Sequence, residues 1–122
     1  MANNSDEHPT ARQLVFMGGS QKALRRFPVA VRDVVGQALY NAQRGTNHPA
    51  TKVLRGFGGA GVVEIVSRAA DGTYRVVYTI AIAEFVVVLH AFQKKSTKGI
   101  ATPKKELDVV RTRLKEAKAR FE

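Results

Sequence analysis

The sequence predicts an α+β fold, in which helices pack on a small and mostly antiparallel sheet. Three runs of β-forming residues follow one another between residues 62 and 92, with only short separations between them. Apolar residues recur at helical spacing on both sides of these runs. The chain has 122 residues, of which 44% are hydrophobic, so one domain with one core is expected.

The domain is expected to cover residues 12–122, behind a disordered tail over residues 1–11 that is polar and offers nothing to bury. The tail lacks the apolar core of a signal peptide, and no apolar run reaches the ~18 residues that cross a bilayer. There are no cysteines, which excludes disulfides, thiolate zinc sites and cysteine nucleophiles. We therefore predict a cytoplasmic protein that does not act at a membrane.

The first half of the chain is predicted to hold one strand, two helices and a loop. Residues 13–17 are β-forming and precede two glycines, which indicates a short strand. Ser20 is expected to cap a brief helix. Pro28 suits the first turn of a longer helix, whose apolar positions repeat at helical spacing up to a stop at Gly45. Residues 46–61 contain a proline and four glycines and are predicted to be a loop.

The second half is predicted to hold the rest of the sheet and a last helix. The strands are expected over residues 62–68, 74–81 and 84–92, and the turn-like separations indicate antiparallel neighbours. Thr102 is expected to cap the last helix, with Pro103 at its first position. Its basic residues lie mostly off an apolar stripe made of Leu107, Val110, Leu114, Ala117 and Phe121.

The chain is strongly basic, with 20 Lys+Arg against 10 Asp+Glu and a net charge of +10. Ten of the cations and four of the acidic residues lie within residues 92–122, so this segment carries a net +6. A basic excess of this size favours phosphate backbones or anionic membrane surfaces as partners.

The motifs of metal, nucleophile and P-loop sites are missing. The three histidines lack ligand spacing, and no HExxH or paired-carboxylate pattern occurs, so neither a metal nor a cofactor is expected. The glycine-rich residues 56–61 lack the lysine and hydroxyl residue of a P-loop, and a flexible loop is the simpler interpretation. His90 alternates with Val86, Val88 and Phe92, which favours a hydrogen-bonded core histidine over a catalytic one.

Basic residues near the strand ends are the strongest candidates for a functional site. Arg75 stands among β-forming residues, and Lys94 and Lys95 close the last strand. Taken singly, each is explained as a solvated charge on a sheet face or at a strand end. Together with Lys52 and Arg55, they could converge on one concave surface where a phosphodiester finds fixed positive charge.

Five short motifs follow one another at specific spacing, namely Lys52-x-Leu54-x-Gly56, Val63-Glu64-Ile65, Tyr74-Arg75-Val76-Val77-Tyr78, Leu89-His90-Ala91-Phe92-x-Lys94-Lys95 and Thr102-Pro103. Over about residues 13–121 the chain thereby resembles the phage-derived, HigB-like branch of the RelE/ParE toxin superfamily. The resemblance implies a RelE-like (microbial-ribonuclease-like) fold. It also implies the toxin of a type II toxin–antitoxin pair, with a helix-turn-helix antitoxin as its partner.

Toxins of this branch are usually ribosome-dependent mRNA endonucleases that inhibit translation. The resemblance implies a metal-independent reaction in which the RNA 2′-hydroxyl attacks the neighbouring phosphate. Cations would stabilise the charge of the phosphorane and move a proton to the departing 5′-oxygen. The catalytic candidates are Arg75, Lys94, Lys95 and Arg68. The candidates for binding RNA and the ribosome are Lys52, Arg55, Lys98, Arg113 and Lys118, the last two on an exposed basic face of the final helix.

One position departs from the family pattern. The family commonly reads Glu-Leu-Arg where this chain has Glu64-Ile65-Val66, so a valine replaces the expected arginine. Arg68 lies two residues on, on the same strand face, and could substitute. The departure favours a first alternative, a non-catalytic RNA- or ribosome-binding protein on the same fold. A ParE-type gyrase-inhibiting toxin is the second alternative, against which the lysine pair after Phe92 argues.

Overall fold

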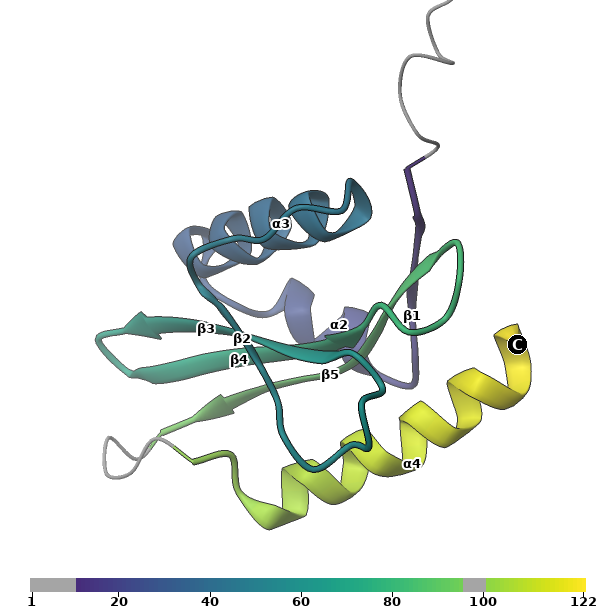
Figure 1. Cartoon of the computed structure of the whole chain (residues 1–122). Coiled ribbons are helices and arrows are strands. Elements are labelled where there is room, and N and C mark those ends of the chain that lie inside the picture. The colour runs from purple at the N-terminus through teal and green to yellow at the C-terminus, as the bar shows by residue number, and fades with distance from the viewer. Residues whose placement is uncertain (1–10, 96–100) are drawn as a thin grey trace, which may run out of the picture.

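The computed structural model describes residues 11–95 and 101–122 and places helices on both faces of one five-stranded sheet (Figure 1). The strands are β1 (Gln13–Phe16), β2 (Thr51–Val53), β3 (Val62–Ala69), β4 (Gly72–Thr79) and β5 (Phe85–Lys94), and the helices are α2 (Ser20–Arg25), α3 (Val29–Gln43) and α4 (Lys104–Phe121). The sheet order is β1-β5-β4-β3-β2, with β1 parallel to β5 and the other neighbours antiparallel. The predicted α+β class, with a mostly antiparallel sheet, is confirmed.

The predicted tail falls almost entirely on residues 1–10, which lie outside the described residues. The division into a tail and a single domain over residues 12–122 therefore stays a prediction. Within the described ranges, no helix is both long enough and apolar enough to cross a membrane.

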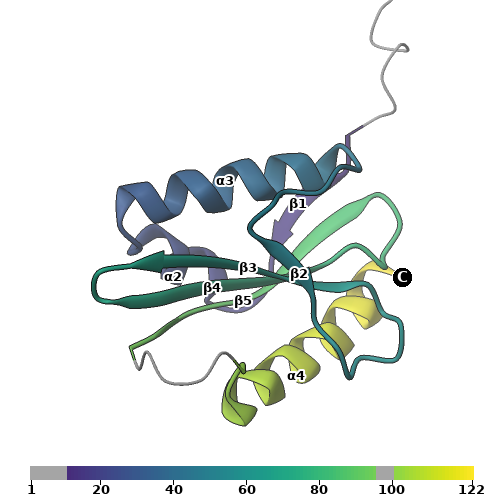
Figure 2. The same cartoon turned by 60° about the vertical axis from the view of Figure 1, so that its left-hand side comes forward.

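Each face of the sheet has its own apolar core, because helices cover both faces (Figure 2). Tyr74, Val76 and Tyr78 of β4 pack on the side of α2 and α3. Val77 packs on the opposite side, against the stripe of α4. Since β4 lies between two strands and two helical layers, every residue in it is buried, including Arg75. This burial makes Arg75 the first residue whose charge requires an explanation.

Two hydroxyl residues that were predicted to cap helices bond to the sheet instead. Pro103 stands at the N-cap of α4 without a side-chain cap, and Thr102 Oγ1 donates to a carboxylate of β3. Gly19 stands at the N-cap of α2, and the buried Ser20 Oγ donates to Val88 O at 3.4 Å. Similarly, Pro28 is the N-cap of α3 and not a residue of its first turn. In the two hydroxyl cases, burial against the sheet gives the side chain a tertiary partner in place of a local one.

The predicted loop over residues 46–61 contains β2, which pairs antiparallel with β3 at the sheet edge. Its three residues are too few to show a periodicity of two, and the glycines that follow it at positive φ look like loop residues in the sequence. Residues 51–53 are therefore a strand because they pair with β3, and not because of a pattern in their own sequence.

The alternation predicted for β5 is wrong beyond Val88, because a β-bulge intervenes. Val77 pairs with His90, whereas Tyr78 pairs with Val88, so one extra residue stands in β5 at this point. Val88 consequently faces α2 and α3, while His90 reaches α4 on the other face. The bulge therefore brings His90 to the same face as the candidate cations.

Candidate functional site

Antiparallel pairing aligns the predicted cations in three rows across the α4-facing side of the sheet. Residues directly opposite one another on neighbouring strands project to the same face. The rows are Lys52–Glu64–Val77–His90, then Val66–Arg75–Phe92, then Arg68–Thr73–Lys94. The sequence-predicted residues of four separate segments thereby share one face of the sheet, and the row of Arg68 and Lys94 lies nearest the β3–β4 turn.

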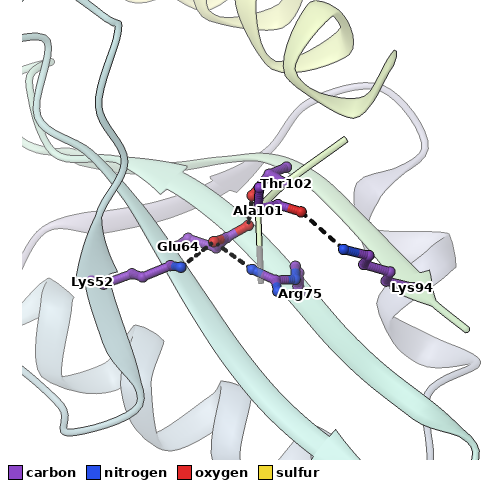
Figure 3. Close-up of polar contacts among 6 residues, drawn as sticks. All are labelled: Lys52, Glu64, Arg75, Lys94, Ala101 and Thr102. Carbon is purple, nitrogen blue, oxygen red and sulfur yellow. Dashed lines mark hydrogen bonds and ion pairs between the residues drawn. The ribbon is translucent and has the colours of Figure 1, made fainter. Parts of the chain in front are cut away.

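The central feature of this face is a buried ion pair between Glu64 and Arg75 (Figure 3). Arg75 Nη1 donates to Glu64 Oε1 at 2.9 Å, and the two residues are 2% and 0% exposed. Thr102 Oγ1 donates to Glu64 Oε2 at 2.8 Å, and Lys52 Nζ lies 3.7 Å from Oε1. Two buried charges are tolerated only when they are paired and hydrogen-bonded. Glu64 therefore fixes β2, β4 and the segment before α4 relative to β3.

Arg75 does not lie on a solvated sheet face, so the simple explanation considered for it is wrong. Its charge is balanced by Glu64, which stands out in the sequence only as part of a motif. The signal that could have identified the pair is the placement of one acidic and one basic residue within adjacent apolar strands. The catalytic role predicted for Arg75 stays a prediction.

The lysine pair borders a groove of about 410 Å³ between the end of β5 and the start of α4. Its lining consists of Phe92, Gln93, Lys94, Lys95, Pro103, Lys105 and Glu106. Lys94 Nζ donates to Ala101 O at 3.0 Å, which ties the end of β5 to the segment entering α4 (Figure 3). Lys95 and Lys105 are exposed. The groove therefore presents three ammonium groups and one carboxylate to a ligand.

The remaining predicted cations are placed differently from one another. Arg68 is exposed at the end of β3, in the same row as Lys94. Arg55 is exposed in the segment between β2 and β3 and does not line the groove. Lys118 is half-buried on α4. Lys98 lies outside the described residues.

Arg113 is not a residue of an exposed basic face, which corrects the expectation for α4. Its Nη1 donates to Leu89 O at 3.0 Å and lies 3.5 Å from His90 Nδ1. A Cβ atom built on Gly18 would stand 2.6 Å from Arg113 Cζ, so the β1–α2 turn closes over this side chain. Arg113 is thus held against the sheet.

His90 and Glu106 form a second polar pair between sheet and helix, which no sequence motif indicated as a site. His90 Nε2 lies 2.7 Å from Glu106 Oε1, and its ring stacks on Phe92 with centroids 4.9 Å apart. A guanidinium is only a donor, so Arg113 beside Nδ1 disfavours a proton on that nitrogen. The proton is therefore assigned to Nε2, which donates to Glu106.

No group of three or more His, Cys, Asp or Glu within residues 11–95 and 101–122 is arranged to hold a metal ion. The candidate site consists of paired charges and a cationic groove. Such a site can bind an anion and move protons through its lysine and carboxylate groups.

A family model described as phage-derived Gp49-like protein matches residues 22–115. Among solved structures, the isolated RelE toxin of E. coli superposes with a TM-score of 0.52 and 20% identity, covering 84% of this chain and 98% of that one. The RelBE2 toxin–antitoxin complex of Mycobacterium tuberculosis gives a TM-score of 0.45 and 19% identity, over 71% and 95% of the two chains. No curated protein matches the sequence. At these identities the likeness to the RelE toxin is one of fold.

Proposed function

Because the chain belongs to the phage-derived Gp49-like family and has the RelE fold, we propose that it is the toxin of a type II toxin–antitoxin pair. The family and the fold confirm the superfamily that the motifs resemble. In this proposal the protein acts in the cytoplasm as a ribosome-dependent mRNA endonuclease and inhibits translation. A helix-turn-helix antitoxin is its protein partner, and the ribosome with bound mRNA is its target.

The observation that carries the proposal is the convergence of three lysines on the groove at the end of β5. Lys94, Lys95 and Lys105 line it, and Arg68 stands in the same row of the sheet as Lys94. A phosphodiester held there would meet the positive charge of three ammonium groups, which can stabilise the negative charge that develops on it. The net charge of +10 supports a polyanionic partner.

The proposed reaction is attack of the RNA 2′-hydroxyl on the adjacent phosphorus. Lys94 and Lys95 stabilise the charge that develops on the phosphorane oxygens, and one ammonium group delivers a proton to the departing 5′-oxygen. Arg68 contacts the neighbouring phosphate of the RNA strand. The reaction needs no metal in this scheme.

In this scheme Arg75 acts indirectly, in place of the catalytic role that the resemblance implies. Because it is buried and paired with Glu64, it acts as a positioning residue. Glu64 of β3 accepts a hydrogen bond from Thr102, and Lys94 of β5 donates one to Ala101 O. These two strands therefore hold the segment before α4, which forms one wall of the groove. Loss of Arg75 would then reduce cleavage by displacing that wall.

A non-catalytic RNA- or ribosome-binding protein on the same fold is the second candidate. The observation that favours it is Val66, which lies opposite Arg75 where the family commonly has an arginine. In that case the cationic groove would bind RNA without cutting it.

The test is cleavage of mRNA by the purified protein on purified ribosomes, with Lys94→Ala/Lys95→Ala as the inactive variant. Lys22→Ala/Arg26→Ala is the matched control, because it removes the same charge from exposed positions at α2, on the other face of the sheet. Cleavage by the parent and control, but not by the groove variant, is expected. Ribosome binding without cleavage would favour the second candidate, and altered DNA supercoiling with intact mRNA would favour the gyrase-inhibiting one.

A further inference from the structure

We propose that Glu106 is the general base that accepts the 2′-hydroxyl proton, and that His90 is the residue that positions it. The inference rests on the proposed function, for which the lysines supply positive charge but no proton acceptor. It arises from the pair that joins β5 to α4 at the wall of the groove.

Among the described residues that line the groove, Glu106 is the one with a carboxylate. It shares that lining with Lys94 at the end of β5, with Lys95 directly after it and with Lys105 of α4. A glutamate in the first turn of a helix is ordinarily explained by the helix dipole. This one has in addition a side-chain partner on the sheet and a place in a cationic groove, which the dipole does not require.

His90 holds the Glu106 carboxylate in one orientation. The imidazole is itself fixed, because it stacks on Phe92 and its Nδ1 faces Arg113. Its Nε2–H donates to Glu106 Oε1 at 2.7 Å. None of the described residues donates to the other oxygen, Oε2, so that oxygen is available to a ligand in the groove.

The charges that face Glu106 suit this role. Lys94 approaches from the end of β5, Lys95 from the position directly after it and Lys105 from α4. The imidazole of His90 approaches from the sheet, with Arg113 behind it. The ammonium groups outnumber the single carboxylate, so an RNA phosphate is still attracted. A sugar 2′-hydroxyl next to that phosphate can then lie within hydrogen-bond reach of the carboxylate.

The proton balance of the step closes without a further reactant. Glu106 takes the proton of the 2′-hydroxyl while the 2′-oxygen forms a bond to phosphorus. The bond between phosphorus and the 5′-oxygen then breaks. A lysine ammonium group gives a proton to that oxygen. The products are a 2′,3′-cyclic phosphate and a 5′-hydroxyl end, and solvent then returns a proton from Glu106 to the lysine.

The decisive variant is Glu106→Gln, which keeps an oxygen that can accept from His90 but cannot take up the proton. Cleavage should fall by about 100-fold or more, in line with the usual contribution of a general base, while ribosome association is unchanged. The rate of the parent should fall toward acid pH as its base is protonated, and the variant should lose this dependence. Glu116→Gln, an exposed position on the same helix outside the groove, should cleave as the parent does.

Three further variants test the inference if Glu106→Gln does not fold. Glu106→Asp retains a carboxylate and should cleave faster than Glu106→Gln or Glu106→Ala. Added formate should restore cleavage to Glu106→Ala, which a purely structural role would not explain. His90→Gln should lower the rate but keep the acid-side dependence.

The outcomes separate the inference from the function on which it rests. A folded Glu106→Gln protein that cleaves mRNA at the parental rate overturns the inference and leaves the endonuclease in place. So does a Glu106→Ala protein that formate does not rescue. A parent that binds ribosomes without cutting mRNA overturns both.

Discussion

Val66 of β3 lies directly opposite Arg75 of β4, on the side of the sheet that faces α4. The resemblance of the motifs implies an arginine at this position. The row of Val66 and Arg75 lies between the row of Glu64 and the row of Arg68 and Lys94. Val66 is half-buried, so a longer side chain at this site could extend toward the end of the sheet. Arg68, in the next row, is the nearest exposed cation on β3.

Restoring the family residue with Val66→Arg should increase mRNA cleavage on ribosomes, because a second guanidinium would reach the proposed phosphate path. The change should also lower the free energy of unfolding by up to about 1 kcal/mol, since like charges directly opposite each other are unfavourable. Val66→Leu is the matched control and should alter neither rate nor charge. Cleavage rates that do not rise in Val66→Arg would indicate that Arg68 already serves this position.

Removal of one partner from the buried pair should destabilise the protein strongly. Arg75→Ala leaves the fully buried Glu64 carboxylate with Thr102 and Lys52 alone, and the expected loss is about 3–5 kcal/mol in the free energy of unfolding. The double variant Glu64→Leu/Arg75→Met should recover most of that stability, because it replaces both charges with apolar groups. Thermal and denaturant unfolding of the three proteins measure this. Equal stabilities of parent and Arg75→Ala would contradict the pairing.

Gly18→Ala should destabilise through two separable effects. Gly18 has φ of 53°, which an alanine adopts with strain, and its new Cβ would meet the guanidinium of Arg113 at 2.6 Å. In an Arg113→Ala background only the backbone strain remains, so the cost of the alanine should be smaller. A double-mutant cycle by denaturant unfolding gives the coupling between the two positions. Strictly additive changes would show that Arg113 does not support the β1–α2 turn.

Charge reversal on the accessible part of α4 should weaken ribosome association if this helix contacts ribosomal RNA. Because Arg113 is held against the sheet, the informative pair is Lys115→Glu and Lys118→Glu. For every phosphate that is no longer neutralised, the slope of log affinity against log salt should become shallower by about 0.7–0.9. Lys22→Glu/Arg25→Glu, which changes the net charge equally at α2, should have a smaller effect on the slope. Identical salt slopes for both pairs would identify α4 as an ordinary solvated face.

Alkaline pH should destabilise the α2- and α3-facing side of the sheet. The hydrogen bond from Tyr74 Oη to Asp71 Oδ2 raises the pKa of Tyr74 above its ordinary value of 10.0, with burial adding to the shift, and burial raises the pKa of Tyr78. Because these pKa values are raised by folding, the stability they contribute is complete below the unfolded pKa. It is lost as pH rises through the folded pKa.

Unfolding measured between pH 8 and 11 should therefore show a decline that begins at about pH 10. Tyr74→Phe removes one of the two tyrosines whose pKa is raised, so the stability of this variant should decline less steeply with pH. Its stability at neutral pH should be lower than that of the parent, because the hydrogen bond to Asp71 is lost. A profile of Tyr74→Phe that parallels the parent would exclude Tyr74 as a contributor.

Much of the fold could be predicted because its signals are local. The strands over residues 62–94 are β-forming runs with short turns between them, and the stripes of α3 and α4 repeat at helical spacing. The sequence could not reveal β2 or the bulge in β5. Three residues carry no periodicity, and a bulge changes the phase of a strand only through its pairing with a neighbour.

The candidate site was predicted in part for the same reason. The order of motifs drew attention to Arg75, Lys94 and Lys95, since basic residues at the ends of apolar strands stand out in the sequence. Their partners did not, because Glu64 and Glu106 are 11 and 16 residues away from Arg75 and His90 along the chain. Antiparallel register and the packing of α4 bring these acidic residues to their partners.

By itself the sequence determined the fold class, the superfamily and the concentration of positive charge toward the C-terminal end, all of which depend on residue type and spacing. Only the tertiary structure decided which of those charges are available. It paired Arg75 with Glu64 inside the sheet, held Arg113 against Leu89 and left Lys95 exposed beside a groove. The physical reason is that the environment of a charge is set by the segments packed around it. A buried cation must find a partner from another strand or helix, whereas an exposed one remains able to meet a ligand.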